Sequence, residues 1–330
     1  MKFLIILLAF VSCAHKSSLK DVDVDLYQMT SSQINSLPDD LWPGFKEYNP
    51  LVIYNTIEGQ YLLGADKYPV MGFNKYNKDH KHPLGQKFQK RVYNTAFPKE
   101  IFQKHYPTLT SSVFMIDSLE RMKSLGRNWN IYDWSTIYIH EIFHLFQGPI
   151  WSKEIIGKKE NIDSTPLQKL KKDKKNIKLV VEEQKIVRSA LLKLDFTNKK
   201  EIKEMCKSLI TKRDSRYKYL KRQIQHSVKN EQFYETLEGT TRYIEKHIDL
   251  YSISDSNKRK YMNKDLLAYL DKHGIKTYYY MLHQIEPGEN YYYETGFGLS
   301  LLLDKLEPKW KNKAFKSTLW EQVTASCNRI

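Results

Sequence analysis

The chain has 330 residues, of which 41% are hydrophobic and 13% aromatic. It can therefore bury a large core, and its composition excludes an intrinsically disordered protein. The net charge is +15; residues 151–230 hold 23 Lys and Arg and 10 Asp and Glu, so 23 − 10 = 13 of these charges lie there. No nucleic-acid-binding motif accompanies this excess, which predicts a solvated lysine-rich helix pair, with attraction to an anionic membrane or envelope polymer as the alternative.

Residues 1–13 are predicted to be a targeting segment. Lys2 precedes the nine apolar residues Phe3–Val11, which are too few to cross a bilayer. The serine and cysteine that follow resemble the cleavage site of a bacterial lipoprotein. That resemblance implies that Cys13 carries a lipid, that this lipid anchors the protein to a membrane, and that the protein lies in the bacterial cell envelope. Ordinary secretion, with cleavage after Ala14, is the alternative.

Residues 14–40 are polar and predicted to be a tether, and residues 41–148 are predicted to form a subdomain that contains a small β-sheet. Runs of β-branched and aromatic residues predict the strands. The last of them before the following helix is expected to lie at the sheet edge, where an extended peptide can add by backbone pairing. The predicted strands are Leu51–Tyr54, Gln60–Leu63, Ser112–Ile116 and, more weakly, Arg91–Thr95.

The most informative segment is Ile137–Gln147, which contains His140-Glu141-x-x-His144 within an apolar run. Two histidines four residues apart lie one above the other on a helix and can bind one metal ion. A glutamate directly after the first histidine is placed to act as a general base towards water. The pattern therefore predicts a zinc hydrolase, usually a peptidase, with one Zn²⁺ per chain and a peptide or protein substrate.

The surroundings of this motif predict a buried helix. Its polar residues Thr136, His140, His144 and Gln147 form a single stripe, and the remaining positions are mostly apolar. Asn130 or Asp133 is expected to cap its N-terminus, and Gly148-Pro149 is expected to end it.

The third metal ligand is expected in Phe233–Glu245. Glu238 is followed by Gly239, which permits a close approach between helices, and the order of residues resembles the glutamate helix of gluzincin peptidases. Glu235, about one turn earlier, is the second candidate, either as ligand or as hydrogen-bond partner of a histidine.

This gluzincin resemblance covers the two helices at about 132–148 and 231–248, and it implies a zincin-like α+β fold. Short-spaced gluzincins would place the third ligand near Glu160 or Asp163, but that stretch is lysine-rich and has no apolar periodicity. Glu238 is therefore preferred, and residues 149–330 are predicted to form a predominantly helical subdomain that carries it.

A third stretch, Tyr291–Asp304, looks like the C-terminal helix of bacterial envelope proteins with gluzincin-type sites. Tyr293 is the candidate donor to an oxyanion in this reading, because it precedes Gly296 in that stretch. Tyr292, His283 and Arg242 are the alternatives.

Two points stay open at this level. Cys206 and Cys327 could pair in an oxidising envelope or remain free thiols. The rival to an enzyme is a helical envelope lipoprotein that acts as a binding or adaptor module, in which zinc is structural or absent.

Overall fold

The structure is a computed structural model of the chain. It describes residues 21–48, 51–55, 60–63, 73–74, 86–88, 113–127, 129–154, 165–223, 227–253, 264–273 and 287–330, together with positions 259, 262 and 285.

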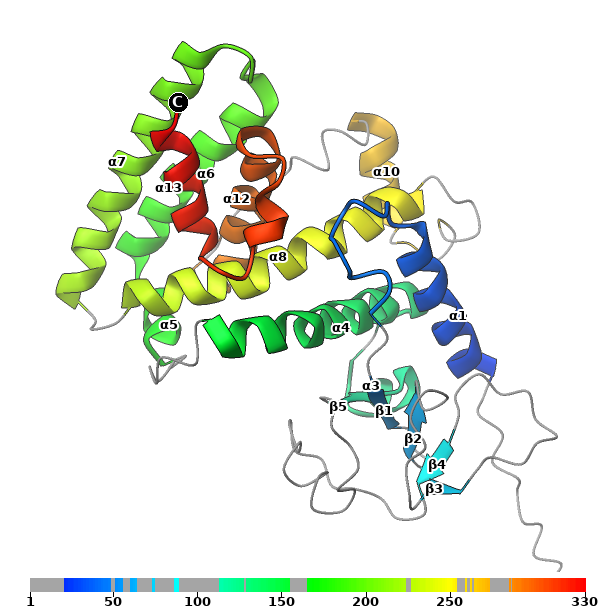
Figure 1. Ribbon diagram of the computed structural model, residues 1–330. Helices are drawn as coiled ribbons and strands as arrows, with labels where there is room; N and C mark the ends of the chain where they lie inside the picture. Colours follow the sequence, from blue (N-terminus) through cyan, green and yellow to red (C-terminus); the bar gives the residue numbers. More distant parts are fainter. Residues whose placement is uncertain are drawn as a thin grey trace, which may run out of the picture.

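Helices dominate the described part of the chain and make up 76% of its interpretable residues. The prediction of an α+β fold with an N-terminal sheet is therefore wrong, because the core is built from helix on helix (Figure 1). The helices are α1 (Asp21–Ser36), α3 (Leu119–Ser124), α4 (Ile131–Glu154), α5 (Thr165–Leu170), α6 (Lys174–Lys193), α7 (Lys199–Gln223), α8 (Ser227–Ile253), α10 (Lys264–His273), α12 (Tyr292–Leu306), the 3₁₀ helix η3 (Trp310–Lys313) and α13 (Leu319–Asn328).

The strands are two to five residues long, and their order is β3-β4-β2-β1-β5. The β1–β5 pair is parallel and the other pairs are antiparallel. The positions predicted for three strands are confirmed, and β5 lies at an edge as expected; Arg91–Thr95 lies outside the described residues. The strands are β1 (Leu51–Asn55), β2 (Gln60–Leu63), β3 (Phe73–Asn74), β4 (Gln86–Phe88) and β5 (Val113–Asp117).

Helix α4 begins where local capping predicts. The side chain of Asn130 accepts a hydrogen bond from the backbone N–H of Asp133, and the Asp133 carboxylate accepts one from the Asn130 N–H. The predicted end at Gly148-Pro149 is wrong, because the helix continues to Glu154. Trp134, Ile139 and Phe143 are buried, as the apolar periodicity indicates.

The segment predicted to be a tether contains α1, so the tether prediction is wrong for residues 21–36. Helix α1 packs against α4 and α8, and the side chain of its Gln33 is fully buried. Directly after α1 the chain enters the core, where the Trp42 ring packs edge-on against Phe143 and stacks on Phe315. These contacts join the N-terminal part of the chain to α4 and to the residues that precede α13.

Helices α8 and α12 cross in backbone contact. A Cβ atom placed on Gly239 of α8 would lie 2.3 Å from the Cα atom of Gly296 in α12. A Cβ atom on Gly296 would lie 2.0 Å from the carbonyl oxygen of Glu235. Only glycine permits this approach at both positions, and it seats α12 on one side of α8 while α4 lies on the other (Figure 1).

Helices α6 and α7 form a long hairpin that is attached to α8 through buried charges. Arg213 pairs with Glu183 and Glu235, and Arg216 pairs with Glu183 and, through two hydrogen bonds, with Glu231. Burial opposes ionisation of Glu183, but the two guanidinium groups lower its pKa overall. Removing one partner from such a network leaves an uncompensated buried charge, so the network fixes how the hairpin docks.

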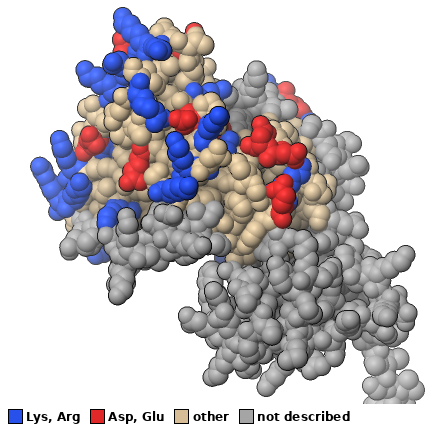
Figure 2. Space-filling view, viewed as in Figure 1, with Lys and Arg blue, Asp and Glu red and all other residues tan. Residues whose placement is uncertain are grey.

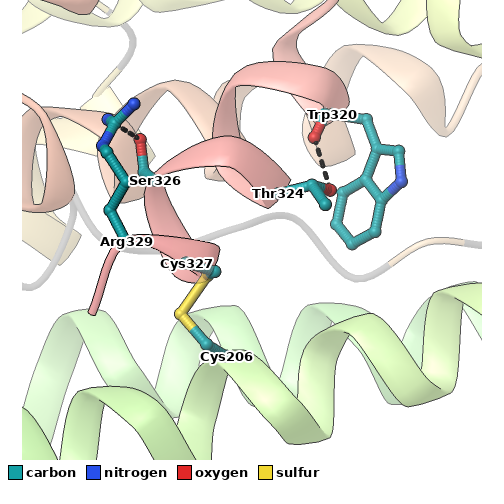
Figure 3. The surroundings of a disulfide bond; sticks show 6 residues. All are labelled: Cys206, Trp320, Thr324, Ser326, Cys327 and Arg329. Atoms are coloured by element: carbon teal, nitrogen blue, oxygen red, sulfur yellow. Dashed lines mark hydrogen bonds between the residues drawn. A yellow bond between two sulfur atoms is a disulfide. The ribbon is translucent and has the colours of Figure 1, made fainter.

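A disulfide between Cys206 and Cys327 joins α7 to α13 (Figure 3). Both cysteines are buried, and they lie 121 residues apart in sequence. The sequence left open whether these two cysteines pair or remain free thiols, and in the structure they pair. Among the described helices, none is both long enough and apolar enough to span a bilayer.

We expect Gly239→Ala to lower the free energy of unfolding by about 1–3 kcal/mol or more, because the added methyl group overlaps the backbone of α12. Gly148→Ala is the matched control: it lies in α4, a Cβ atom there meets nothing within 4 Å, and it should be neutral or stabilising by up to about 1 kcal/mol. Urea unfolding of the two variants measures both effects. Equal midpoints for the two variants would contradict the close crossing.

We expect Cys206→Ser to lower the free energy of unfolding by about 2–5 kcal/mol, because the unfolded chain gains freedom when the cross-link is lost. Reduction of the wild-type protein should reproduce the change, whereas the same reductant should leave the variant unaffected. If the reductant shifts both proteins equally, the stabilisation does not come from this bond.

Candidate metal centre

Three side chains from two helices converge at one point. Residues His140 and His144 lie one turn apart on α4, and Glu238 faces them from α8. The Nε2 atoms of the two histidines are 2.9 Å apart, and Oε2 of Glu238 lies 3.5 Å from the first and 3.2 Å from the second. The ligand set predicted from the sequence is thus assembled in one place.

The triangle of donor atoms has the size that a zinc site needs. Ligand atoms at about 2.0–2.1 Å from a tetrahedral ion are separated by about 3.3 Å. The three separations of 2.9, 3.2 and 3.5 Å lie on either side of this value. Two imidazole nitrogens and one carboxylate oxygen are also a donor set that zinc favours.

The outer nitrogen of each imidazole is engaged as a donor, so each inner nitrogen is left to bind either a proton or a metal ion. Nδ1 of His140 lies 2.6 Å from a carboxylate oxygen of Glu245, which can only accept a hydrogen bond. Nδ1 of His144 lies 2.9 Å from Oε1 of Gln147. Oε2 of Glu238 is buried and has no hydrogen-bond donor. Two imidazole nitrogens and a carboxylate oxygen that face one another are stabilised by a cation between them.

The electrostatics of the site favour a positive charge at the same point. Burial alone would lower the pKa of His140, but Glu238 and Glu245 outweigh it and raise this pKa to about 10. Burial opposes ionisation of Glu238, yet the neighbouring imidazoles of His140 and His144 lower its pKa to about 2. The carboxylates therefore stay ionised and stabilise a cation, whether a proton or a metal ion.

Gln147 sets the orientation of His144 by spanning two helices. Its Nε2 donates to the carbonyl oxygen of Leu237 at 3.2 Å and to the hydroxyl of Thr240 at 2.7 Å, both on α8. This leaves Oε1 to accept from Nδ1–H of His144. The side chain is fully buried, so its amide has one arrangement that satisfies all of these partners.

Glu245 sets the orientation of His140, and its own carboxylate is bound by Arg242. Arg242 lies 2.6 Å from the second oxygen of Glu245 and 3.2 Å from Glu294 of α12. Burial would raise the pKa of Glu245, but Arg242 and His140 lower it to about 2. A carboxylate that accepts a hydrogen bond from the outer nitrogen of a histidine fixes the orientation of the imidazole ring and makes the inner nitrogen more basic.

Tyr293, the candidate donor to an oxyanion, lies beside His140. Its ring stacks on that of His140, with centroids 6.0 Å apart. Burial, followed by the Glu238 carboxylate, raises the pKa of its phenol well above the ordinary value, so the hydroxyl keeps its proton at neutral pH. Tyr292 is similar, with burial and Glu238 raising its pKa to about 12. The guanidinium of Arg242 is instead committed to Glu245 and Glu294.

Glu141 follows His140 on α4 and is half-buried. Its carboxylate is one of the charges that raise the pKa of His140, which places it close to the ligands. Within the described part of the chain no hydrogen bond or ion pair of its side chain is found.

One of the alternatives for the third ligand is wrong. Glu235 neither joins the triangle nor accepts a hydrogen bond from a histidine; it is fully buried and pairs with Arg213. Burial raises its pKa, although Arg213 opposes the shift. Four other candidates lie outside the described residues: Glu160, Asp163, His283 and Cys13.

Sequence reasoning did not assign the roles of Gln147 and Glu245, although both carried a signal. Gln147 follows His144 by three residues, on the same stripe of α4. Glu245 follows Glu238 by seven residues, two turns along the same side of α8. Two turns of spacing on a helix that already supplies a ligand would have identified a partner for the other histidine.

Comparison with protein-family models, with curated proteins and with solved structures finds no match to this chain.

We expect Gln147→Leu to weaken metal binding by about 10–100-fold, because His144 loses the acceptor that orients its ring. Thr136→Val is the control on the same stripe of α4; its hydroxyl bonds only to the Tyr132 carbonyl oxygen among the described groups, and the affinity should not change. Competition with a chelating dye gives the affinity, and circular dichroism verifies folding. Unchanged affinity in folded Gln147→Leu would exclude this role.

Proposed function

We propose that the protein is a zinc-dependent hydrolase of peptide bonds, of the gluzincin type that the sequence resembles. The observation that carries the proposal is the convergence of His140, His144 and Glu238 into one triangle of acceptor atoms. No fourth His, Cys, Asp or Glu joins this group within the described ranges. Three protein ligands with one open position are typical of catalytic zinc sites, whereas structural sites are closed.

Each neighbouring residue has a role in this chemistry. Zinc, when bound, lowers the pKa of a water and polarises the carbonyl group of the substrate. Glu141 takes a proton from the attacking water and returns it to the leaving amine. Tyr293, whose hydroxyl remains protonated, donates a hydrogen bond to the oxygen on which negative charge develops. The edge strand β5 is our candidate for alignment of an extended substrate.

We place this activity in the bacterial cell envelope. The predicted lipoprotein segment that ends at Cys13 supports a lipid anchor. The disulfide between Cys206 and Cys327 adds support, because such bonds form and persist in oxidising compartments.

The decisive experiment is Glu141→Gln in the purified protein. Elemental analysis should find about one zinc per chain in the wild type and in this variant, because Glu141 is not a ligand. Cleavage of a peptide library should fall by about 10²–10⁴-fold, since the general base is lost. His140→Ala should lose both the metal and the activity.

Glu204→Gln, an exposed glutamate on α7, is the matched control and should retain both zinc and activity. Absence of any transition metal, with no uptake when zinc is added, would reject the metal site. Zinc binding without hydrolysis of any peptide would instead favour the adaptor reading.

A further inference from the structure

The hairpin formed by α6 and α7 has a strongly basic surface. Residues 174–223 contain 16 Lys and Arg and 6 Asp and Glu. Arg213, Arg216 and Glu183 are buried, and their charges are paired within the core network that also contains Glu231 and Glu235 of α8. Subtracting these leaves 16 − 2 = 14 basic and 6 − 1 = 5 acidic side chains at the surface. Figure 2 shows Lys and Arg side chains projecting over α7 and the neighbouring helices.

The outer face of this hairpin also carries an open apolar groove of about 470 Å³ between the two helices. Ile186 and Ala190 of α6, Leu194 directly after it and Met205 of α7 line the groove. The exposed Lys185 and Lys193 and one acidic residue, Glu201, lie at the same groove. Apolar lining and ammonium groups therefore occur together on one face.

An exposed leucine extends the apolar character of this face. Leu192 is 44% exposed, and it lies seven residues, about two turns, after Lys185 on the same side of α6. A large aliphatic side chain among lysines contributes nothing to solubility and little to contact with a sugar–phosphate backbone. It suits a surface that offers both anionic groups and hydrocarbon.

We infer that the α6–α7 face docks on an anionic phospholipid bilayer. Charge complementarity carries the choice of partner: lysines meet the lipid phosphates, while Leu192 and the groove accept the hydrocarbon beneath them. Nucleic acid would use the charge but not the apolar groove. Figure 1 shows the hairpin on the side of α8 opposite α4, so docking leaves the helix with the two histidines uncovered. The inference is independent of hydrolytic activity.

The test is co-sedimentation of the full chain with vesicles. Wild-type protein should bind vesicles of phosphatidylglycerol and phosphatidylcholine, and the binding should weaken with added salt. Lys185→Glu combined with Lys193→Glu should reduce the partition coefficient by about tenfold or more. The matched control reverses two exposed lysines elsewhere, Lys123 on α3 and Lys272 on α10, and should bind nearly as the wild type does.

A second comparison separates a bilayer from a general polyanion. Leu192→Ser should weaken binding to the anionic vesicles without changing retention on a short DNA duplex. The inference is overturned if the wild type ignores anionic vesicles at low salt, or if both charge-reversed pairs lose binding equally. It is also overturned if Leu192→Ser binds vesicles as the wild type does, because the surface then recognises charge alone.

Discussion

The close approach of the α8 and α12 backbones at Gly239 and Gly296 constrains the geometry of the candidate site. Glu238 precedes the first glycine on α8 and faces the histidines of α4. Tyr293 lies three residues before the second glycine on α12 and stacks on His140. One helix crossing therefore places both the Glu238 carboxylate and the Tyr293 ring beside the histidines, and a change of a few tenths of an ångström at the crossing would move both.

The basic residues of the α6–α7 hairpin divide according to their chemistry. The two that are buried, Arg213 and Arg216, are arginines whose planar guanidinium groups form several hydrogen bonds with Glu183 and with glutamates of α8. The lysines remain at the surface, where their compact charges stay hydrated. The same sequence segment thus supplies both the charge network that anchors the hairpin and the positive face that we assign to a bilayer.

Much of the secondary structure follows from local signals, whereas the fold class does not. The apolar run around Ile137–Gln147 and the cap at Asn130 predict α4, and a predominantly helical chain after residue 149 was expected. The end of α4 was misplaced, because the helix continues through Gly148-Pro149 to Glu154. Helix α1 was missed because its sequence has weak periodicity and its stability comes from packing on α4 and α8.

The sequence by itself determined the chemistry of the site: two histidines one turn apart, a glutamate beside the first, and Glu238 next to a glycine. These choices are local, because spacing on one helix decides which side chains share a face. Only the tertiary structure decided between Glu238 and Glu235, assigned Gln147 and Glu245 to the outer nitrogens of the histidines, and paired two cysteines 121 residues apart. Such contacts depend on how helices cross and dock, and crossing is set by packing between segments that are distant along the chain.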